Sequence, residues 1–210
     1  MDLSVVVRLA PPGAVLVAMA DTGQELPLPP EEAALVAGAV EKRRRDFALG
    51  RSCARAALAQ IGHANAVVGR GAGGAPAWPN GVIGSITHTQ GFAAALVATA
   101  GPYQGLGIDA ERSNGMDEKL FARLFTPPER GRLAGLPEAR RKCAATLLFS
   151  AKEAWFKAHH PVTGQRLAFQ QVEITPGDGD FSARRLDGAS GPVTGRFVLL
   201  DDLVVTVIWW

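Results

Sequence analysis

Apolar residues occur along the chain either in short runs or in long helical patterns. Short runs bounded by Gly, Pro, Asn or Asp predict strands. In the first half they predict strands over residues 4–9, 14–19, 82–87, 92–99 and 106–111. The first two runs are separated by Ala-Pro-Pro-Gly, which predicts either a β-hairpin or two strands joined by a turn.

Ala and Leu recur at helical spacing in two long segments. Residues 28–62 begin with a Pro-Pro pair and end at Gly62, so they predict one long helix or two consecutive ones. Residues 138–159 predict another long helix. It follows the sequence Thr-Pro-Pro-Glu at residues 126–129, which is typical of a capping box at the start of a short helix. Residues 69–81 are rich in Gly and Pro and predict a loop.

The C-terminal part returns to strands, expected over residues 171–175, 181–186, 195–200 and 203–209. Because the strands follow one another without a helix between each pair, the pattern predicts an α+β fold with mostly antiparallel sheets. Each half of the chain contains a long helix followed by a sheet, which hints at duplication. No repetition of individual residues accompanies it.

Composition excludes several classes of protein. The chain is 47% hydrophobic and 20% charged with a net charge of +2, which is too small to indicate nucleic-acid binding by itself. Asp2, Arg8 and the Pro11-Pro12 pair interrupt the apolar N-terminus, so it does not resemble a signal peptide. Cys53 and Cys143 lie in helical segments and predict two buried, reduced thiols. We expect a cytoplasmic protein without membrane association.

Two carboxylates follow an apolar run in the sequence GIDAER. Asp109 and Glu111 lie two residues apart, so a strand directs both to the same face, where each raises the pKa of the other unless a cation lies between them. Two solvated carboxylates at a strand end are one interpretation. The other is a magnesium site, because Mg²⁺ binds carboxylates, water and substrate phosphates.

A later helical segment, LLFSAKEAWFKA, offers further candidates for such a site. Glu153 and Lys157 are four residues apart and therefore share a helix face, either as an exposed ion pair or as part of a site. Phe149 and Phe156 are placed to hold the helix against a core. Lys152 is about 100° around the helix from Glu153 and is expected to face a different part of a cleft.

Candidate phosphate-binding groups occur in two earlier stretches. His88 is expected just past a strand, next to Thr87, and such side chains suit hydrogen bonds to phosphate; a turn histidine without a ligand is the alternative. Arg43 and Arg51 are eight residues apart and share a helix face, where their guanidinium groups can bind two phosphates. A solvated basic face or a nucleic-acid patch over residues 42–55 is the alternative.

Taken together, RRRDFALGRSCAR, PAWPNGVIGSITHT, GIDAE and FSAKEAWFKA resemble the 4′-phosphopantetheinyl transferases of the larger, monomeric surfactin/enterobactin type. The resemblance covers most of residues 40–160. It implies a pseudo-dimer of two similar α+β halves, each a long helix packed on a mostly antiparallel sheet, with coenzyme A between them. We place the halves at residues 1–105 and 106–210, with the metal site in the second.

The resemblance also implies roles for individual residues. The implied Mg²⁺ ligands, for which Mn²⁺ is a possible substitute, are Asp109, Glu111 and Glu153. The implied coenzyme A contacts are Arg43, Arg51, Thr87, His88 and Lys157. The implied catalytic residues are Glu153, Lys157 and His88. Glu153, or a water bound to the metal, is the candidate general base, and Lys157 and His88 would stabilise charge on the transferring and leaving groups.

The implied reaction transfers phosphopantetheine from coenzyme A to a serine of an apo acyl or peptidyl carrier protein and releases 3′,5′-ADP. Polyketide, nonribosomal peptide and siderophore biosynthesis use such carriers. The carrier is expected to dock near residues 121–136. Related enzymes often carry a cation where this chain has Gly73-Gly74-Ala75, and Arg70 is a candidate substitute. The alternatives are another Mg²⁺-dependent enzyme acting on a nucleotide pyrophosphate, and a basic nucleic-acid-binding module.

Overall fold

The computed structural model describes residues 2–113 and 116–210. Its helices are α1 (Ser4–Val7), α2 (Pro30–Ala34), α3 (Glu41–Gln60), α4 (Phe121–Leu124), α5 (Pro127–Ala134) and α6 (Glu138–Thr163). Short 3-10 helices are η1 (Ala72–Gly74), η2 (Glu118–Leu120) and η3 (Phe169–Gln171). Its strands are β1 (Val15–Ala20), β2 (Gly69–Arg70), β3 (Pro76–Ala77), β4 (Val82–Thr89), β5 (Phe92–Thr99), β6 (Leu106–Arg112), β7 (Val172–Pro176), β8 (Asp180–Arg185), β9 (Val193–Leu200) and β10 (Leu203–Trp209).

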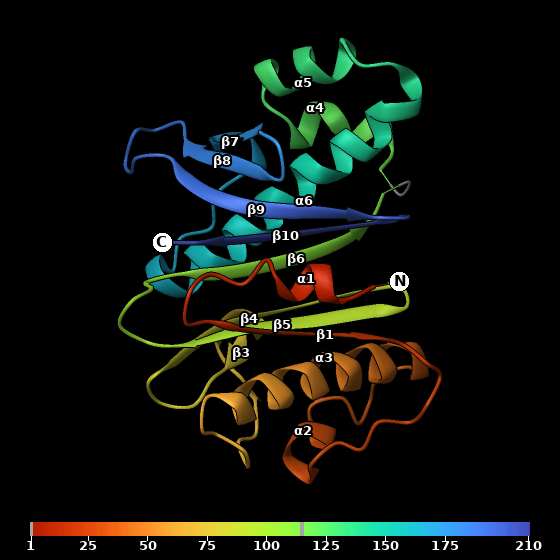
Figure 1. The fold of residues 1–210 in the computed structure, drawn as a ribbon, viewed down its shortest axis with the longest axis vertical. Coiled ribbons are helices and arrows are strands. Elements are labelled where there is room, and N and C mark those ends of the chain that lie inside the picture. Colours follow the sequence, from red (N-terminus) through yellow and green to blue (C-terminus); the bar gives the residue numbers. More distant parts are fainter. Residues whose placement is uncertain (1, 114–115) are drawn as a thin grey trace.

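The first half is a three-stranded antiparallel sheet, in the order β1-β5-β4, covered on one face by α3 (Figure 1). Strand β5 is apolar over nearly its whole length because it lies in the centre of the sheet, where both faces are covered. Cys53 and Ala57 of α3 are fully buried and pack against Ala93 and Ala95 of β5. Small side chains on both surfaces therefore let the helix lie close to the sheet.

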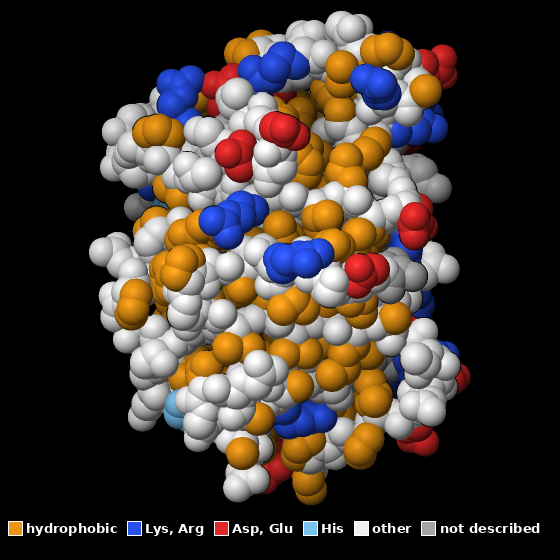
Figure 2. Space-filling model, in the orientation of Figure 1, with side chains coloured by type: hydrophobic (Ala, Val, Ile, Leu, Met, Phe, Trp, Pro, Cys, Tyr) orange, Lys and Arg blue, Asp and Glu red, His pale blue; other side chains and the backbone are white. Residues whose placement is uncertain are grey.

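The second half is a five-stranded antiparallel sheet, in the order β6-β10-β9-β8-β7, with α6 across one face. Helices α4 and α5 pack beyond the N-terminal part of α6, at the top of Figure 1. On the face shown in Figure 2, apolar side chains lie over the middle of the molecule, and Lys, Arg, Asp and Glu side chains are more frequent near the upper end. The predicted fold class, two similar halves each with a long helix on an antiparallel sheet, is confirmed.

Strands β4 and β6 lie side by side at the seam between the two sheets. Side chains bridge them: the Ser85 hydroxyl accepts from the Ile108 amide at 3.2 Å and the Thr87 hydroxyl from the Ala110 amide at 3.0 Å. Both hydroxyl-bearing residues are buried. Buried backbone amides need acceptors. The two hydroxyl groups supply them for the Ile108 and Ala110 amides, which lie on the edge of β6 that has no neighbouring strand in the described part of its own sheet.

The strand predicted over residues 4–9 is wrong, because the segment forms helix α1. Val6 and Leu9, three residues apart, are both buried on one face and pack in the same core cluster as Leu203 and Val205 of β10. The Asp2 carboxylate accepts from the Ser4 amide at 2.9 Å at the start of the helix. Tertiary packing thus outweighs the strand preference of three consecutive valines.

The remaining predicted elements are confirmed or need small corrections. The segment 28–62 forms two consecutive helices, which is one of the two predicted arrangements. The long helix predicted to end at about His159 continues to Thr163, where Gly164 ends it with a φ of 67°. His88 lies within β4 rather than beyond it. The capping box at Thr126 is confirmed. The predicted loop 69–81 contains the short pair β2-β3.

Cys53 and Cys143 are free thiols. Cys53 is buried, but Cys143 is only half-buried, whereas the sequence predicted two buried thiols.

Within the residues that the structure describes, no helix combines the length and apolar character needed to cross a bilayer.

Candidate active site

Strand β6 crosses α6 at a point where only glycine fits. Gly107, Asp109 and Glu111 lie at alternate positions of the strand and therefore share one face. A Cβ added to Gly107 would lie 1.9 Å from the backbone oxygen of Ala154 in α6. The absence of a side chain lets strand and helix approach closely. The two carboxylates of β6 are thereby placed beside the helix residues that flank Ala154.

Asp109 is at the centre of this contact and is 3% exposed. Its Oδ1 accepts from the Lys157 ammonium at 2.7 Å and from the Thr87 hydroxyl at 3.3 Å. Lys157 also donates to the Ile108 carbonyl at 3.3 Å. Asp109 Oδ2, by contrast, is buried and has no hydrogen-bond partner within residues 2–113 and 116–210. A buried carboxylate oxygen without a partner is costly, which makes this atom a candidate ligand for a cation.

Two further carboxylates lie near Asp109, and both are half-buried. Burial, followed by the negative charges of Asp109 and Glu153, raises the pKa of Glu111 to about 7, although Lys157 opposes this. Burial and the Asp109 charge also raise the pKa of Glu153. A divalent cation stabilises such an arrangement, because its charge offsets the effect of Asp109 on the other two carboxylates.

The three carboxylates lie near one another but do not form a ready-made metal site. Among the described residues, no three His, Cys, Asp or Glu side chains are already arranged to hold a metal ion. Lys157 pairs with Asp109 at 2.7 Å rather than with Glu153, so the exposed Glu153–Lys157 pair considered from the sequence is not the pair that forms. The unpartnered Asp109 oxygen and the raised pKa values of Glu111 and Glu153 nevertheless fit a divalent cation in chemical terms.

The histidine and arginine candidates lie on the other side of β4. Thr87 faces Asp109 and Lys157, whereas His88 contacts Arg43 of α3, with 3.0 Å between Arg43 Nη1 and His88 Nε2. Burial and the Arg43 charge lower the pKa of His88. The neutral imidazole and the guanidinium together form a candidate anion-binding pair.

Arg51 differs from Arg43, although the sequence assigned both to phosphate binding. Its side chain is buried, donates to the Gly69 carbonyl at 2.9 Å and lies over the Phe47 ring at 4.6 Å. Burial also lowers its pKa. These contacts attach the β2-β3 loop to α3, and the phosphate-binding role of Arg51 stays a prediction.

A cavity of about 730 Å³ opens at the seam, between the Gly73–Trp78 loop, strand β4 and the C-terminal part of α6. Lys157 and His160 line it from α6. Gly73 has a φ of 65°, and a Cβ there would lie 3.6 Å from both Arg166 Nη2 and His160 Cε1. The guanidinium group of Arg166, which lies next to this loop, therefore comes from the second half of the chain, whereas Arg70 is exposed on β2.

The sequence placed Lys152 in a cleft, and this is wrong. Its side chain is completely buried and pairs at 2.7 Å with Glu129, which is also completely buried. The sequence assigned Glu129 only to a capping box. A lysine among apolar helix residues was the available signal, since a buried ammonium group requires an acid partner.

Comparison with known proteins agrees with this geometry. Residues 31–98 match the model of the 4′-phosphopantetheinyl transferase N-terminal domain, and residues 105–208 match that of the 4′-phosphopantetheinyl transferase superfamily. The chain belongs to this superfamily. The family-matched ranges of the transferase include Arg43, Thr87, Asp109 and Lys157.

Curated relatives match the transferase over most of its length. The 4′-phosphopantetheinyl transferase Svp of Streptomyces mobaraensis is 46% identical, over 85% of this chain and 77% of that protein. Npt of Nocardia iowensis is 36% identical, over 95% of this chain and 97% of that protein. PptT of Mycobacterium tuberculosis is 38% identical, over 85% and 84% respectively. The chain is therefore an enzyme of the 4′-phosphopantetheinyl transferase class.

Proposed function

We propose that this transferase moves 4′-phosphopantetheine from coenzyme A to a serine hydroxyl of an apo acyl or peptidyl carrier protein, depends on Mg²⁺, and releases 3′,5′-ADP. The observation that carries the proposal is the site at the seam. There, the carboxylates of Asp109, Glu111 and Glu153 lie near one another, Asp109 Oδ2 has no hydrogen-bond partner among the described residues, and Lys157 pairs with Asp109.

Asp109, Glu111 and Glu153 would hold the metal ion. Their oxygen donors suit Mg²⁺, with Mn²⁺ as a possible substitute. When bound, the ion would neutralise charge on the pyrophosphate of coenzyme A. Asp109 Oδ2 supports this assignment, because no donor in the described part of the chain reaches that atom.

The chain's own side chains would handle the proton and the developing charge. The serine oxygen would attack the phosphorus that carries pantetheine, the bond from this phosphorus to the oxygen of 3′,5′-ADP would break, and the serine proton would pass to Glu153. The raised pKa of Glu153 suits a proton acceptor at neutral pH. Lys157 would stabilise charge on the transferring and leaving phosphates.

Coenzyme A would lie in the cavity at the seam. Lys157 lines this cavity and donates to the Thr87 hydroxyl at 3.3 Å, and the pair of Arg43 and His88 would bind phosphate from the first half. Arg51 would act there only if its bond to the Gly69 carbonyl broke. We place the division between the halves at residues 105 and 106, close to where the two family models divide the chain.

The carrier protein would dock on α4 and α5, residues 121–136. This region and its neighbours expose many cations, which favours an acidic partner. The exposed cations are Lys119, Arg123, Arg130, Arg132, Arg140 and Lys142. The transferase would act as a monomer, and the free thiols of Cys53 and Cys143 suit a reducing, cytoplasmic compartment.

Incubation with coenzyme A, Mg²⁺ and a panel of apo carrier proteins tests the proposal. Intact-mass measurement should detect one phosphopantetheine on at least one fatty-acid, polyketide or nonribosomal-peptide carrier. The panel would also identify the pathway, siderophore biosynthesis included. Absence of transfer to every carrier, with a folded enzyme, would contradict the proposal.

A further inference from the structure

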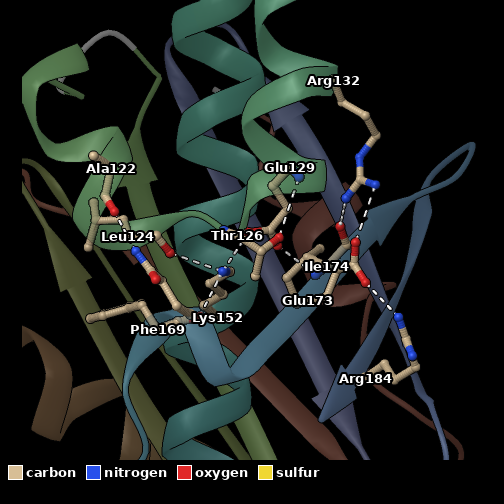
Figure 3. Close-up of polar contacts among 11 residues, drawn as sticks. Ala122, Leu124, Thr126, Glu129, Arg132, Lys152, Phe169, Glu173, Ile174 and Arg184 are labelled. Carbon is tan, nitrogen blue, oxygen red and sulfur yellow. Dashed lines mark hydrogen bonds and ion pairs between the residues drawn. The ribbon is translucent and has the colours of Figure 1, made fainter. Parts of the chain in front are cut away.

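Lys152 lies immediately before Glu153 in α6, but its ammonium group points away from the site and is completely buried. Three oxygens surround it: Glu129 Oε2 at 2.7 Å, the Phe169 carbonyl at 2.8 Å and the Leu124 carbonyl at 3.0 Å (Figure 3). An ammonium group has three donors, so all three are used. Its position is therefore fixed by segments from three parts of the chain.

Glu129 is fixed equally well from the other side. Its Oε2 also accepts from the Thr126 amide at 2.7 Å, and its Oε1 accepts from the Ile174 amide of β7 at 2.7 Å. Figure 3 shows these bonds converging between α5, α6 and β7. A buried charge that loses its partner costs much free energy. The relative positions of Lys152 and Glu129 are therefore held more firmly than those of two apolar side chains in contact would be.

The contacts join the candidate docking segment to the catalytic helix. Leu124 ends α4, and Thr126 and Glu129 begin α5, so both helices are attached to the Lys152 ammonium group. On α6, the side chains of Lys152 and Glu153 point in directions that differ by about 100° around the helix axis. The ion pair is one of the contacts that hold the rotation of α6 about its axis, and it therefore contributes to the direction in which Glu153 faces.

We propose that the buried Lys152–Glu129 ion pair is a positioning device, which holds the α4–α5 segment in a fixed place relative to Glu153 so that a serine presented by a docked carrier protein reaches the site. This proposal rests on the proposed function. Neither Lys152 nor Glu129 lines the cavity in which coenzyme A would lie. The pair acts through the helices that it joins.

The double variant Lys152→Met/Glu129→Gln removes both charges and leaves no buried charge unpaired. In the absence of Mg²⁺, we expect it to bind coenzyme A with an affinity close to that of the wild type, because neither residue lines the cavity at the seam. Its kcat should fall and its KM for the carrier protein should rise. Together these changes should lower kcat/KM for the carrier by about 10- to 100-fold, since a misplacement of about 1 Å can lower activity about 100-fold.

The matched control is Glu25→Gln/Arg8→Met. It removes one negative and one positive charge from exposed positions outside the α4–α5 segment and outside the lining of the cavity. It should retain kcat and both KM values near those of the wild type. An equal loss in both double variants would overturn the proposal, because surface charge alone would then account for the effect.

A purely structural role predicts a lower melting temperature with unchanged kinetics of the folded protein, and that result would also overturn the proposal. If the Lys152 double variant does not fold, Glu129→Gln alone carries the test, because it keeps an amide oxygen for Lys152. It should raise KM for the carrier with little change in coenzyme A affinity, and unchanged kinetics would overturn the proposal. A wild type without any transfer would instead contradict the proposed function.

Discussion

Replacing Gly107 with alanine should separate the two elements that build the site. The new Cβ would lie 1.9 Å from the Ala154 backbone oxygen. To restore an ordinary contact, α6 would have to retreat from β6 by about 1.5 Å. Overpacking a protein core usually lowers the unfolding free energy by about 1–3 kcal/mol. Because the new Cβ and the Ala154 oxygen both belong to the backbones of packed elements, we expect a loss at or above the upper end of that range.

The retreat of α6 would also move Glu153 and Lys157, which flank Ala154, away from Asp109. The 2.7 Å contact between Lys157 and Asp109 would lengthen. Since a misplacement of about 1 Å can lower activity about 100-fold, transfer by the folded Gly107→Ala protein should fall by about that factor.

Urea denaturation and a carrier-transfer assay measure the two effects. Gly38→Ala is the matched control, because nothing lies within 4 Å of a Cβ at that position, and its stability and activity should stay near those of the wild type. If Gly107→Ala unfolds at the same urea concentration as the wild type and transfers at the same rate, the close approach of strand and helix does not determine the site.

Three further results are expected. Thr126→Ala should lower the unfolding free energy by about 1 kcal/mol in urea denaturation, because the helix cap is lost, and an unchanged midpoint would contradict this. Arg166→Ala should raise KM for coenzyme A about 10-fold, because a hydrogen bond to a charged group is worth about 1.5–3 kcal/mol. Arg70→Ala should raise this KM less. A larger increase for Arg70→Ala in steady-state kinetics would instead assign the phosphate contact to Arg70. Chelation with EDTA should stop transfer and added Mg²⁺ should restore it, and a rate insensitive to EDTA would exclude the metal assignment.

Much of the fold was predictable because its local signals agree with its packing. The apolar runs of β4, β5, β6 and β10 are strands, and the capping box before α5 is present. The segment at residues 4–9 was not predictable in this way. Its three valines favour a strand, but burial of Val6 and Leu9 in the core that both sheets share decides for a helix.

The candidate site was predictable in its residue types but not in its pairings. Periodicity placed Glu153 and Lys157 on one face, yet Lys157 pairs with Asp109, which is 48 residues earlier. Local spacing carries no information about such contacts, because they depend on how closely β6 and α6 pack. The same reason explains Lys152, whose partner Glu129 lies 23 residues before it and was assigned only to a helix cap.

Intact-mass measurement of an apo carrier protein, incubated with coenzyme A, Mg²⁺ and either wild-type enzyme or Asp109→Ala, tests the central claim most directly. The wild type should add one phosphopantetheine group and release one equivalent of 3′,5′-ADP. The folded Asp109→Ala variant should add none, because the buried carboxylate at the centre of the site is gone. A wild type that modifies no carrier, or an Asp109→Ala variant that transfers at the wild-type rate, would contradict the account.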